Sequence, residues 1–301
     1  MNVFVTGGTG FVGSFLVRRL VDAGHRVTIL SRRQMADTVS PAVAFVSGDP
    51  TLPGPWQGVM AAHDAVINLA GRSIFCRWTE ANRRAIRESR TRTTANIAGV
   101  LAPLPGKVLI NASAVGYYGD CGDLEVDEDA PAGDDFLAHL ARAWEAEAVR
   151  AGQGGSRVVL CRFGVVLGRD GGALATMLPG FRLGVASPLG NGRQWFPWIH
   201  LEDLARVILF CLDQEGMSGP VNCTAPQPVT NRGFTVALAR ALGKRVLLPP
   251  VPAFLLRLLL GELAGVLLSG QKVRPARLLA AGFTFRYPDI ESCLRSLVGK
   301  A

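Results

Sequence analysis

The chain has 301 residues, 49% of them hydrophobic, and this composition suits a folded protein with a sizeable core and excludes a disordered chain. Its formal charge of +8 comes from basic residues spread along the sequence, without a polybasic block, so a nucleic-acid partner is not expected. The six cysteines show neither CxxC metal spacing nor the density of a disulfide scaffold. The first residues run directly into a strand pattern without a secretion signal. From these two observations we expect a cytoplasmic protein.

Short apolar runs rich in β-branched residues alternate with helical segments, which is typical of βαβ units. In chain order we expect a strand at 3–6, a helix at 11–23, strands at 26–30, 43–46 and 65–70, a helix at 80–101, a strand at 107–112, a helix at 135–150, and strands at 157–162 and 221–224. Such a series builds a parallel sheet covered on both faces. The sequence therefore predicts the α/β class, with a doubly wound parallel sheet of the Rossmann type and a smaller C-terminal lobe.

The turn after the first strand carries the glycines of a dinucleotide site, in both GxGxxG and GxxGxxG spacing, between a strand and a helix. Glycine permits the tight turn and a close approach of the backbone to a pyrophosphate, while free N–H groups at the helix start attract the anion. We predict cofactor contacts along the whole turn: Gly7, Gly8, Thr9, Gly10, Phe11, Val12 and Gly13.

The end of the second strand indicates which dinucleotide binds. An NAD site places Asp or Glu about 20 residues past the glycines for the ribose hydroxyls, whereas this chain has Ser31, Arg32 and Arg33. Guanidinium groups grip a 2′-phosphate that a carboxylate would repel. The sequence therefore predicts NADP(H), with two exposed loop arginines as the competing interpretation.

Two further places suit a cofactor bed. Leu69, Ala70 and Gly71 end the fourth strand, where small residues let the adenosine half lie against the backbone. Asp49 follows the third strand and serves either as an acceptor for the adenine amino group or as a turn residue.

Several motifs, together with the glycine turn, resemble the extended short-chain dehydrogenases/reductases, the NAD-dependent epimerase/dehydratase relatives. The wider resemblance rests on residues 66–71 and 198–203. Residues 77–79, 113–119, 164–168, 190–195, 225–231 and 270–273 resemble, more narrowly, the atypical branch called "epimerase family protein", which has its own C-terminal domain of unknown function. The resemblance covers essentially the whole chain.

The wider family catalyses with a Tyr-x-x-x-Lys pair and a nearby Ser or Thr, the lysine lowering the pKa of the tyrosine. None of the three tyrosines here is followed four residues later by lysine, and residues 137–144, where the resemblance places the pair, contain neither residue type. The ordinary mechanism is therefore not available to this chain.

Three functions remain open: oxidoreductase or epimerase chemistry on an unidentified small molecule through other groups, a non-catalytic NADP(H) sensor or scaffold, and a partner-binding role of the C-terminal lobe. For the first we name Tyr118 and Ser113 as catalytic candidates, with His139 and Glu145 as further groups. The competing interpretation is that Tyr118 packs the pocket wall, His139 lies on the surface and Glu145 is a helix charge.

The resemblance also implies two cofactor contacts. Arg90 lies on the long helix that faces the cofactor cleft, so its guanidinium is expected to reach the phosphates; the alternative is a solvated face shared with Arg83, Arg84, Arg87 and Arg92. The backbone at Val165, just past the sixth strand, is expected beside the nicotinamide ribose.

Residues 190–196 offer either a substrate-side loop that stacks a ring and holds an anion, or a hinge between lobes. His200 and Asp203 are interpreted as groups that orient a strand–helix junction, and no metal site is expected. We expect residues 1–225 to form the NADP(H)-binding domain, with 168–200 contributing to the small substrate-side lobe of residues 226–301.

The apolar run 246–269 is broken by three prolines and then by Arg257 and Glu262. We therefore expect an amphipathic helix packed on the domain, and neither a membrane span nor a membrane partner.

Overall fold

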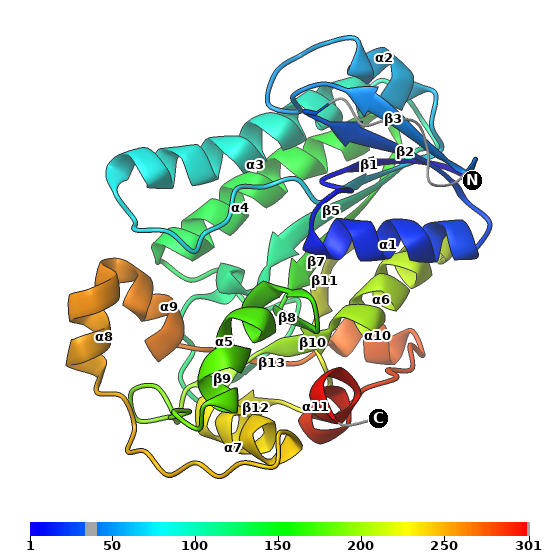
Figure 1. Ribbon diagram of the computed structural model, residues 1–301. Coiled ribbons are helices and arrows are strands. Elements are labelled where there is room, and N and C mark those ends of the chain that lie inside the picture. The colour runs from blue at the N-terminus through cyan, green and yellow to red at the C-terminus, as the bar shows by residue number, and fades with distance from the viewer. Residues whose placement is uncertain (34–40, 300–301) are drawn as a thin grey trace.

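The computed structural model describes residues 1–33 and 41–299 of the chain. Its centre is a seven-stranded parallel sheet in the order β11-β7-β5-β4-β1-β2-β3 (Figure 1). The strands are β1 Asn2–Thr6, β2 Arg26–Ser31, β3 Val43–Ser47, β4 Ala65–Asn68, β5 Val108–Ala114, β7 Arg157–Phe163 and β11 Gly219–Cys223. All seven predicted strands are present, so the predicted doubly wound fold is confirmed.

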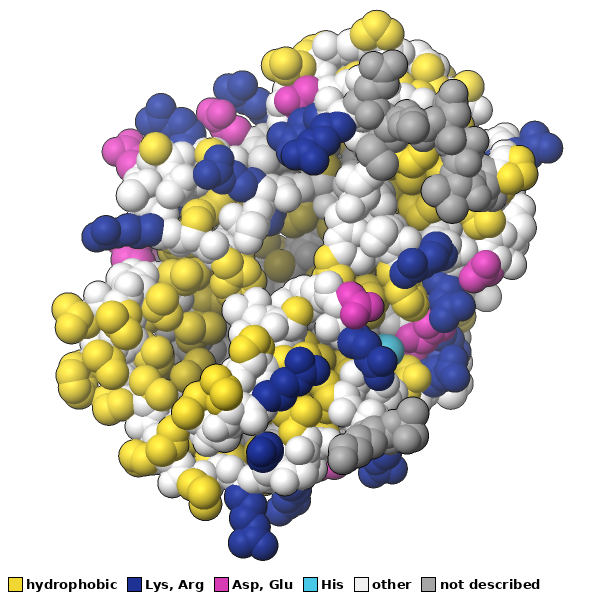
Figure 2. Space-filling view, in the orientation of Figure 1, with side chains coloured by type: hydrophobic (Ala, Val, Ile, Leu, Met, Phe, Trp, Pro, Cys, Tyr) yellow, Lys and Arg dark blue, Asp and Glu magenta, His cyan; other side chains and the backbone are white. Residues whose placement is uncertain are grey.

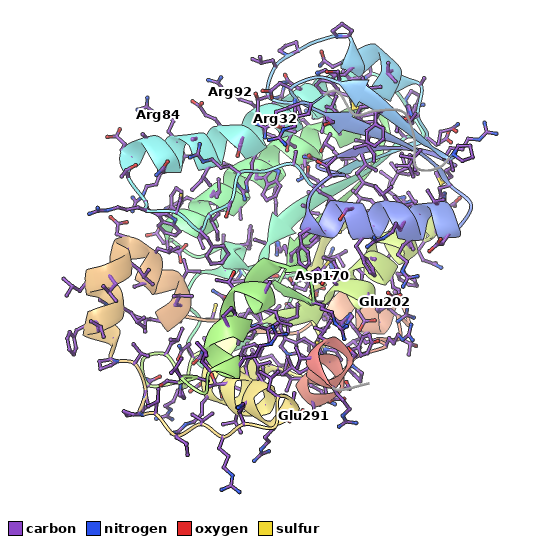
Figure 3. All side chains as sticks on the ribbon, viewed as in Figure 1. Arg32, Arg84, Arg92, Asp170, Glu202 and Glu291 are labelled. Atoms are coloured by element: carbon purple, nitrogen blue, oxygen red, sulfur yellow. The ribbon has the colours of Figure 1, made fainter. Side chains whose placement is uncertain are left out.

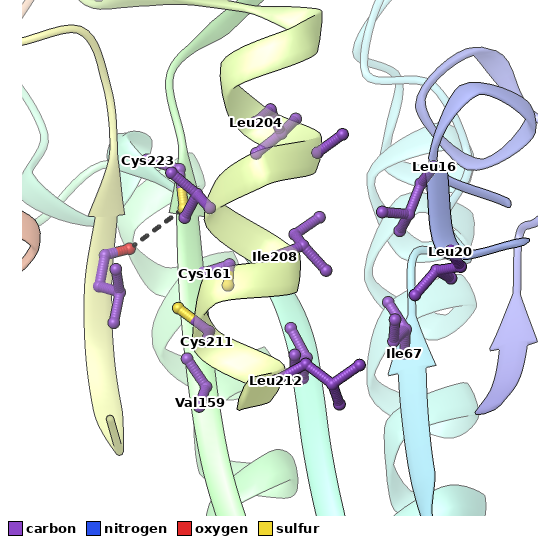
Figure 4. Close-up of a cluster of buried hydrophobic side chains, with 14 of the residues drawn as sticks. Leu16, Leu20, Ile67, Val159, Cys161, Leu204, Ile208, Cys211, Leu212 and Cys223 are labelled. Carbon is purple, nitrogen blue, oxygen red and sulfur yellow. Dashed lines mark hydrogen bonds between the residues drawn. The ribbon is translucent and has the colours of Figure 1, made fainter. Parts of the chain in front are cut away.

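Helices cover both faces of the sheet because alternate strand residues point to opposite sides. Val3 and Val5 face α1 (Phe11–Asp22) and α6 (Leu201–Asp213), where Figure 4 shows Leu16 and Leu20 opposite Leu204 and Ile208. Phe4 lies on the opposite face, in a core shared with α2 (Trp56–Ala61), α3 (Glu80–Leu101) and α4 (Phe136–Val149). The sheet is thus buried on both sides, and its carboxyl edge remains for ligands.

Side-chain caps fix where two of the site's helices begin. Thr79 Oγ1 accepts a hydrogen bond from the Asn82 N–H at the start of α3, and Asp135 Oδ1 accepts one from the Ala138 N–H at the start of α4. These caps satisfy N–H groups that the helix leaves unpaired.

A second core lies beside the sheet and joins segments from both halves of the chain. It packs Leu174 and Phe181 of α5 (Gly172–Arg182) against Phe234 of α7 (Asn231–Ala241) and Leu294 of α11 (Ile290–Val298). Short ladders hold this region: β8 (Val165–Gly168) with β10 (Trp198–His200), β9 (Trp195–Phe196) with β12 (Val229–Thr230), and β6 (Glu125–Val126) with β13 (Lys272–Val273).

The expectation of one packed amphipathic helix in the run 246–269 is wrong. The run forms α8 (Ala253–Leu260) and α9 (Ala264–Leu268), joined by the short 3-10 helix Gly261–Leu263. Of the α8 side chains only Leu256 is buried, because the helix packs on the protein along one narrow line. A further short helix, α10 (Ala276–Ala280), and the 3-10 turns Val115–Tyr118 and Arg150–Gly154 complete the described elements. No helix in the described ranges is long and apolar enough to cross a bilayer.

Candidate dinucleotide and substrate site

The backbone of the predicted phosphate-binding turn lies in close contact with the loop that follows β4. Gly7 has φ +71°, and a Cβ there would lie 2.7 Å from the carbonyl carbon of Leu69, at the end of β4. A Cβ at Gly13 would lie 2.1 Å from the carbonyl oxygen of Gly7. Glycine is therefore required at both positions, because any side chain would push the turn away from α1 and β4.

The start of α1 suits an anion. Its N-cap is Gly10, which gives no side-chain cap, and the first turn contains no acidic residue. Thr9 and Gly10 are exposed to solvent. The N–H groups at this helix end therefore point into accessible space with the positive end of the helix dipole behind them, which fits the pyrophosphate of a dinucleotide.

The basic residues predicted to select NADP(H) lie at the carboxyl end of β2. Ser31 is buried and its hydroxyl accepts a hydrogen bond from the Arg33 N–H at 3.2 Å. The Arg32 and Arg33 side chains are exposed, and Figure 3 labels Arg32. Asp49, beyond β3, has the geometry of a turn residue: its Oδ1 accepts from the Thr51 hydroxyl at 2.7 Å and from the Thr51 N–H at 2.9 Å. The Thr51 bonds, helped by the charge of Arg32, hold the pKa of Asp49 below its usual value.

A buried amide network fixes the loop after β4. Asn68 Oδ1 accepts from the Thr6 hydroxyl at 2.6 Å and from the Ala70 N–H at 3.3 Å, and Asn68 Nδ2 donates to Asn111 Oδ1 at 2.7 Å. Because these bonds tie the carboxyl ends of β1, β4 and β5 together, Leu69, Ala70 and Gly71 leave the sheet directly beside the glycine turn.

Arg90 folds back over this loop. Its Nη1 donates to the carbonyl of Arg72 at 2.9 Å, and its guanidinium lies 5.1 Å from the centre of the Trp144 ring. A Cβ at Gly71 would be 3.2 Å from the guanidinium carbon. Burial lowers the pKa of Arg90 to about 10. The side chain is therefore packed against the loop after β4 and does not belong to a solvated face, while its contact with the cofactor stays a prediction.

The other arginines of α3 divide into two groups. Arg84, Arg87 and Arg92 are exposed, and Figure 3 shows Arg84 and Arg92 pointing away from the helix. Arg83 departs from the expected solvated face, because it lies over the Phe136 ring and pairs with Glu262 of the C-terminal segment.

The two catalytic candidates belong to one buried ionic network. Strand register places Ser113 opposite Arg162. Glu145 of α4 accepts from the Ser113 hydroxyl at 2.6 Å and from Arg162 Nε and Nη2, both at 2.9 Å. Arg162 Nη1 donates to the Tyr118 hydroxyl at 2.9 Å, and that hydroxyl donates to Asn222 Oδ1 at 2.7 Å. Burial raises the pKa of Tyr118 to about 12.

This network continues into the C-terminal segment. Glu128 is buried, accepts from the Asn222 N–H at 3.0 Å, and also accepts from the backbone N–H of Arg277. Burial raises the pKa of Glu128 above its usual value. Sequence reasoning missed Arg162, Asn222 and Glu128, although a charged residue inside a predicted buried strand is a signal that would have found Arg162.

The other residues predicted to bind or catalyse make contacts with other parts of the protein. The Val165 N–H donates to the Pro197 carbonyl at 2.7 Å, so its amide is already engaged. His139 lies partly exposed beside Asp134. In the loop 190–196, Gln194 Nε2 donates to the carbonyls of Leu189 and Leu267, which ties the loop to α9.

His200 and Asp203 orient a strand–helix junction, as predicted. His200 Nδ1 accepts from the Glu202 N–H at 2.9 Å as the N-cap of α6, and Asp203 accepts from the backbone N–H groups of Arg286 and Tyr287, both at 2.8 Å. Within residues 1–33 and 41–299, no group of three His, Cys, Asp or Glu side chains has an arrangement that could hold a metal ion.

The surface is hollowed near the centre of the view, between the half that carries α3 and the lobe that carries α5 and α8 (Figure 2). A glycine turn, a basic strand end and a hollow at the carboxyl edge of the sheet are shared by the dinucleotide-binding short-chain dehydrogenases/reductases, and they define the class of this protein.

Comparison with known proteins narrows the class. Residues 3–223 match the model of the NAD dependent epimerase/dehydratase family, and residues 251–297 match a domain of unknown function, DUF1731. The chain therefore belongs to the NAD-dependent epimerase/dehydratase family.

Relatives align along the whole chain. It is 41% identical over 303 residues to "Epimerase family protein SDR39U1 homolog, chloroplastic" of Arabidopsis thaliana, covering 99% of this chain and 87% of the relative. It is 39% identical over 301 residues to "Epimerase family protein YfhF" of Bacillus subtilis, covering 99% and 98%. The crystal structure of human epimerase family protein SDR39U1 with NADPH is similar, with 37% identity, a TM-score of 0.87 and 99% of both chains covered.

Proposed function

We propose that the chain binds NADP(H), with the pyrophosphate at the start of α1 and the 2′-phosphate on Arg32 and Arg33. The observation that carries the proposal is the pair of exposed guanidinium groups at the end of β2, where an NAD-selective site has a carboxylate. The human relative crystallised with NADPH supports it.

We propose further that the chain is an oxidoreductase or epimerase that acts in the cytoplasm on a small molecule held in the central hollow. The nicotinamide would supply or accept a hydride there. Under this proposal residues 1–225 form the cofactor-binding domain, and residues 226–301, together with 168–200, form the substrate-side lobe.

The catalytic role of Tyr118 and Ser113 stays a prediction, and their contacts favour a second candidate function. Both hydroxyls already donate to buried partners, and the pKa of Tyr118, raised to about 12, disfavours loss of its proton at neutral pH, so neither group is free to exchange a proton with a substrate. This observation favours a non-catalytic NADP(H) sensor as the alternative.

Cofactor titration tests the binding proposal. Arg32→Ala combined with Arg33→Ala should weaken NADPH binding by about tenfold to 150-fold, the value of one charge-assisted contact of roughly 1.5–3 kcal/mol, and leave NADH binding unchanged. The matched control is Arg18→Ala with Arg26→Ala, which removes two exposed arginines from other parts of the domain. Equal losses for NADPH and NADH would refute the assignment.

Turnover separates the two functions. NADPH oxidation is followed by absorbance while carbonyl compounds are screened as substrates. Interconversion of sugar-nucleotide isomers is followed by chromatography, because an epimerase returns the hydride and leaves the cofactor unchanged overall. Turnover that falls in Tyr118→Phe supports catalysis through Tyr118. Tight NADPH binding that survives Tyr118→Phe, without turnover of any substrate, supports the sensor.

A further inference from the structure

An exposed apolar surface surrounds α8, and we call it the α8 patch. Its most exposed side chains are Leu247 at 81%, Leu258 at 78%, Phe254 at 71% and Leu259 at 70%, and Leu248 and Leu255 complete it. Figure 2 shows the hydrophobic atoms gathered over α8 and α9 at the left of the view, with an acidic side chain only at their upper edge. Contiguous exposed apolar surface of this kind marks an interaction site.

The segment of chain that carries the α8 patch has charges of a single sign up to Glu262. Between Glu215 and Glu262 the chain contains no acidic residue. The same stretch carries five cations, all exposed: Arg232, Arg240, Lys244, Arg245 and Arg257. Glu262 itself pairs with Arg83 and is not available to balance them.

The positive charge of this segment favours an anionic partner over a second copy of the chain. A second copy of the chain in a two-fold dimer would place the patch against itself, so Lys244, Arg245 and Arg257 would meet the same cations with no carboxylate to pair them. An anionic lipid surface offers negative headgroups for the cations and an acyl boundary for the leucines. The patch projects leucine and phenylalanine side chains from a short helix into solvent, a shape that enters a lipid boundary without a matching pocket.

We propose that the α8 patch binds the surface of an anionic bilayer. Phe254, Leu258 and Leu259 enter the boundary between headgroups and acyl chains, while Lys244, Arg245 and Arg257 contact anionic headgroups. No described helix of this run is long enough to cross a bilayer, but a surface contact needs no spanning helix, so the proposal departs from the sequence expectation of no membrane partner. The proposal is independent of the dinucleotide site, because none of these residues belongs to it.

Vesicle flotation with the full chain tests the proposal. The protein should float with vesicles of phosphatidylcholine mixed with phosphatidylglycerol and stay unbound with phosphatidylcholine alone. Lys244→Gln with Arg245→Gln should weaken binding about fivefold for each cation removed, from about 1 kcal/mol per cation near an anionic surface. Phe254→Ser with Leu258→Ser should weaken it by roughly tenfold or more, because two exposed apolar anchors are lost.

Matched controls remove the same residue types elsewhere. Leu52→Ser removes an exposed leucine beside α2, and Arg18→Gln with Arg26→Gln removes two exposed cations. Both control variants should float like the unmodified protein. The proposal is overturned if the protein stays unbound with both kinds of vesicle, or if the patch and control variants bind equally. It is also overturned if light scattering shows a dimer that Phe254→Ser with Leu258→Ser dissociates, since the occupant is then a second copy.

Discussion

Replacing Glu145 with glutamine should lower the free energy of unfolding by about 3–5 kcal/mol, the usual cost of leaving one partner of a buried ion pair alone. Arg162 is only 3% exposed, and Glu145 accepts from both Nε and Nη2 at 2.9 Å. Burial by itself would lower the pKa of Arg162, but the bonds and charge of Glu145 outweigh it and raise the pKa above its ordinary value. An arginine keeps its proton at neutral pH even without a carboxylate beside it, so the guanidinium stays charged after the substitution and loses its counter-ion.

Thermal or urea unfolding followed by circular dichroism measures this loss. At about 2–4 °C per kcal/mol for a chain of this size class, the midpoint should fall by roughly 6–20 °C. Glu147→Gln is the matched control on the same helix, since its pair with Arg150 is partly exposed and contributes about 0.5 kcal/mol or less.

A double-mutant cycle tests whether the loss of stability comes from the ion pair between Glu145 and Arg162. Glu145→Gln combined with Arg162→Met should cost clearly less than the sum of the two single substitutions, because the second removes the charge that the first leaves unpaired. A loss below about 1 kcal/mol for Glu145→Gln, or additive losses, would refute the reasoning.

Three further predictions use the same protein. Gly13→Ala should destabilise the protein and abolish NADPH binding in a fluorescence titration, because its Cβ would meet a backbone oxygen at 2.1 Å. Gly99→Ala is the control: its Cβ would meet nothing within 4 Å, so it should stabilise the protein by about 0.5–1 kcal/mol. Equal effects of the two substitutions would contradict the packing argument. Burial lowers the pKa of His200 from 6.5 to about 4, so the unfolded chain takes up a proton first and about 3 kcal/mol of stability is lost as pH falls through that window. His200→Asn keeps an N-cap acceptor without titrating and should lose less between pH 7 and 4 in urea melts; identical pH profiles would count against this origin. Arg90→Lys should weaken NADPH binding about tenfold by losing the planar stack, while the exposed Arg87→Lys should leave it unchanged, and a matched effect of both would remove Arg90 from the site.

The sheet could be predicted because its evidence is local. Each strand is a short apolar run ended by turn residues, and a run that is apolar on both faces is typical of a buried parallel sheet. A strand–helix junction was expected at His200 and Asp203, but the bounds of helix α6 (Leu201–Asp213) were not predicted, because His200 is an uncommon N-cap that gives no start pattern. The ladder β8–β10 has three residue pairs and the ladder β9–β12 has two, too few for an alternating pattern to appear.

In the candidate site, too, the features that lie in one short sequence segment could be predicted, and those built from distant segments could not. The glycine turn and the arginines after β2 lie within short, contiguous motifs, so their position in the fold followed from the sequence. The buried ionic network did not, since Glu145 and Arg162 come from different elements and meet only through strand register and helix packing. Glu145 was named as a candidate, but its partner Arg162 was not.

The contact between Gly7 and Leu69 constrains any attempt to engineer the cofactor preference. Because the two loops touch backbone to backbone, a replacement of residues 7–13 with the turn of another dehydrogenase leaves no slack to absorb a different loop shape. A successful graft must carry the segment 69–71 along with the turn, and the asparagine that anchors it, so the two loops behave as one transplantable unit.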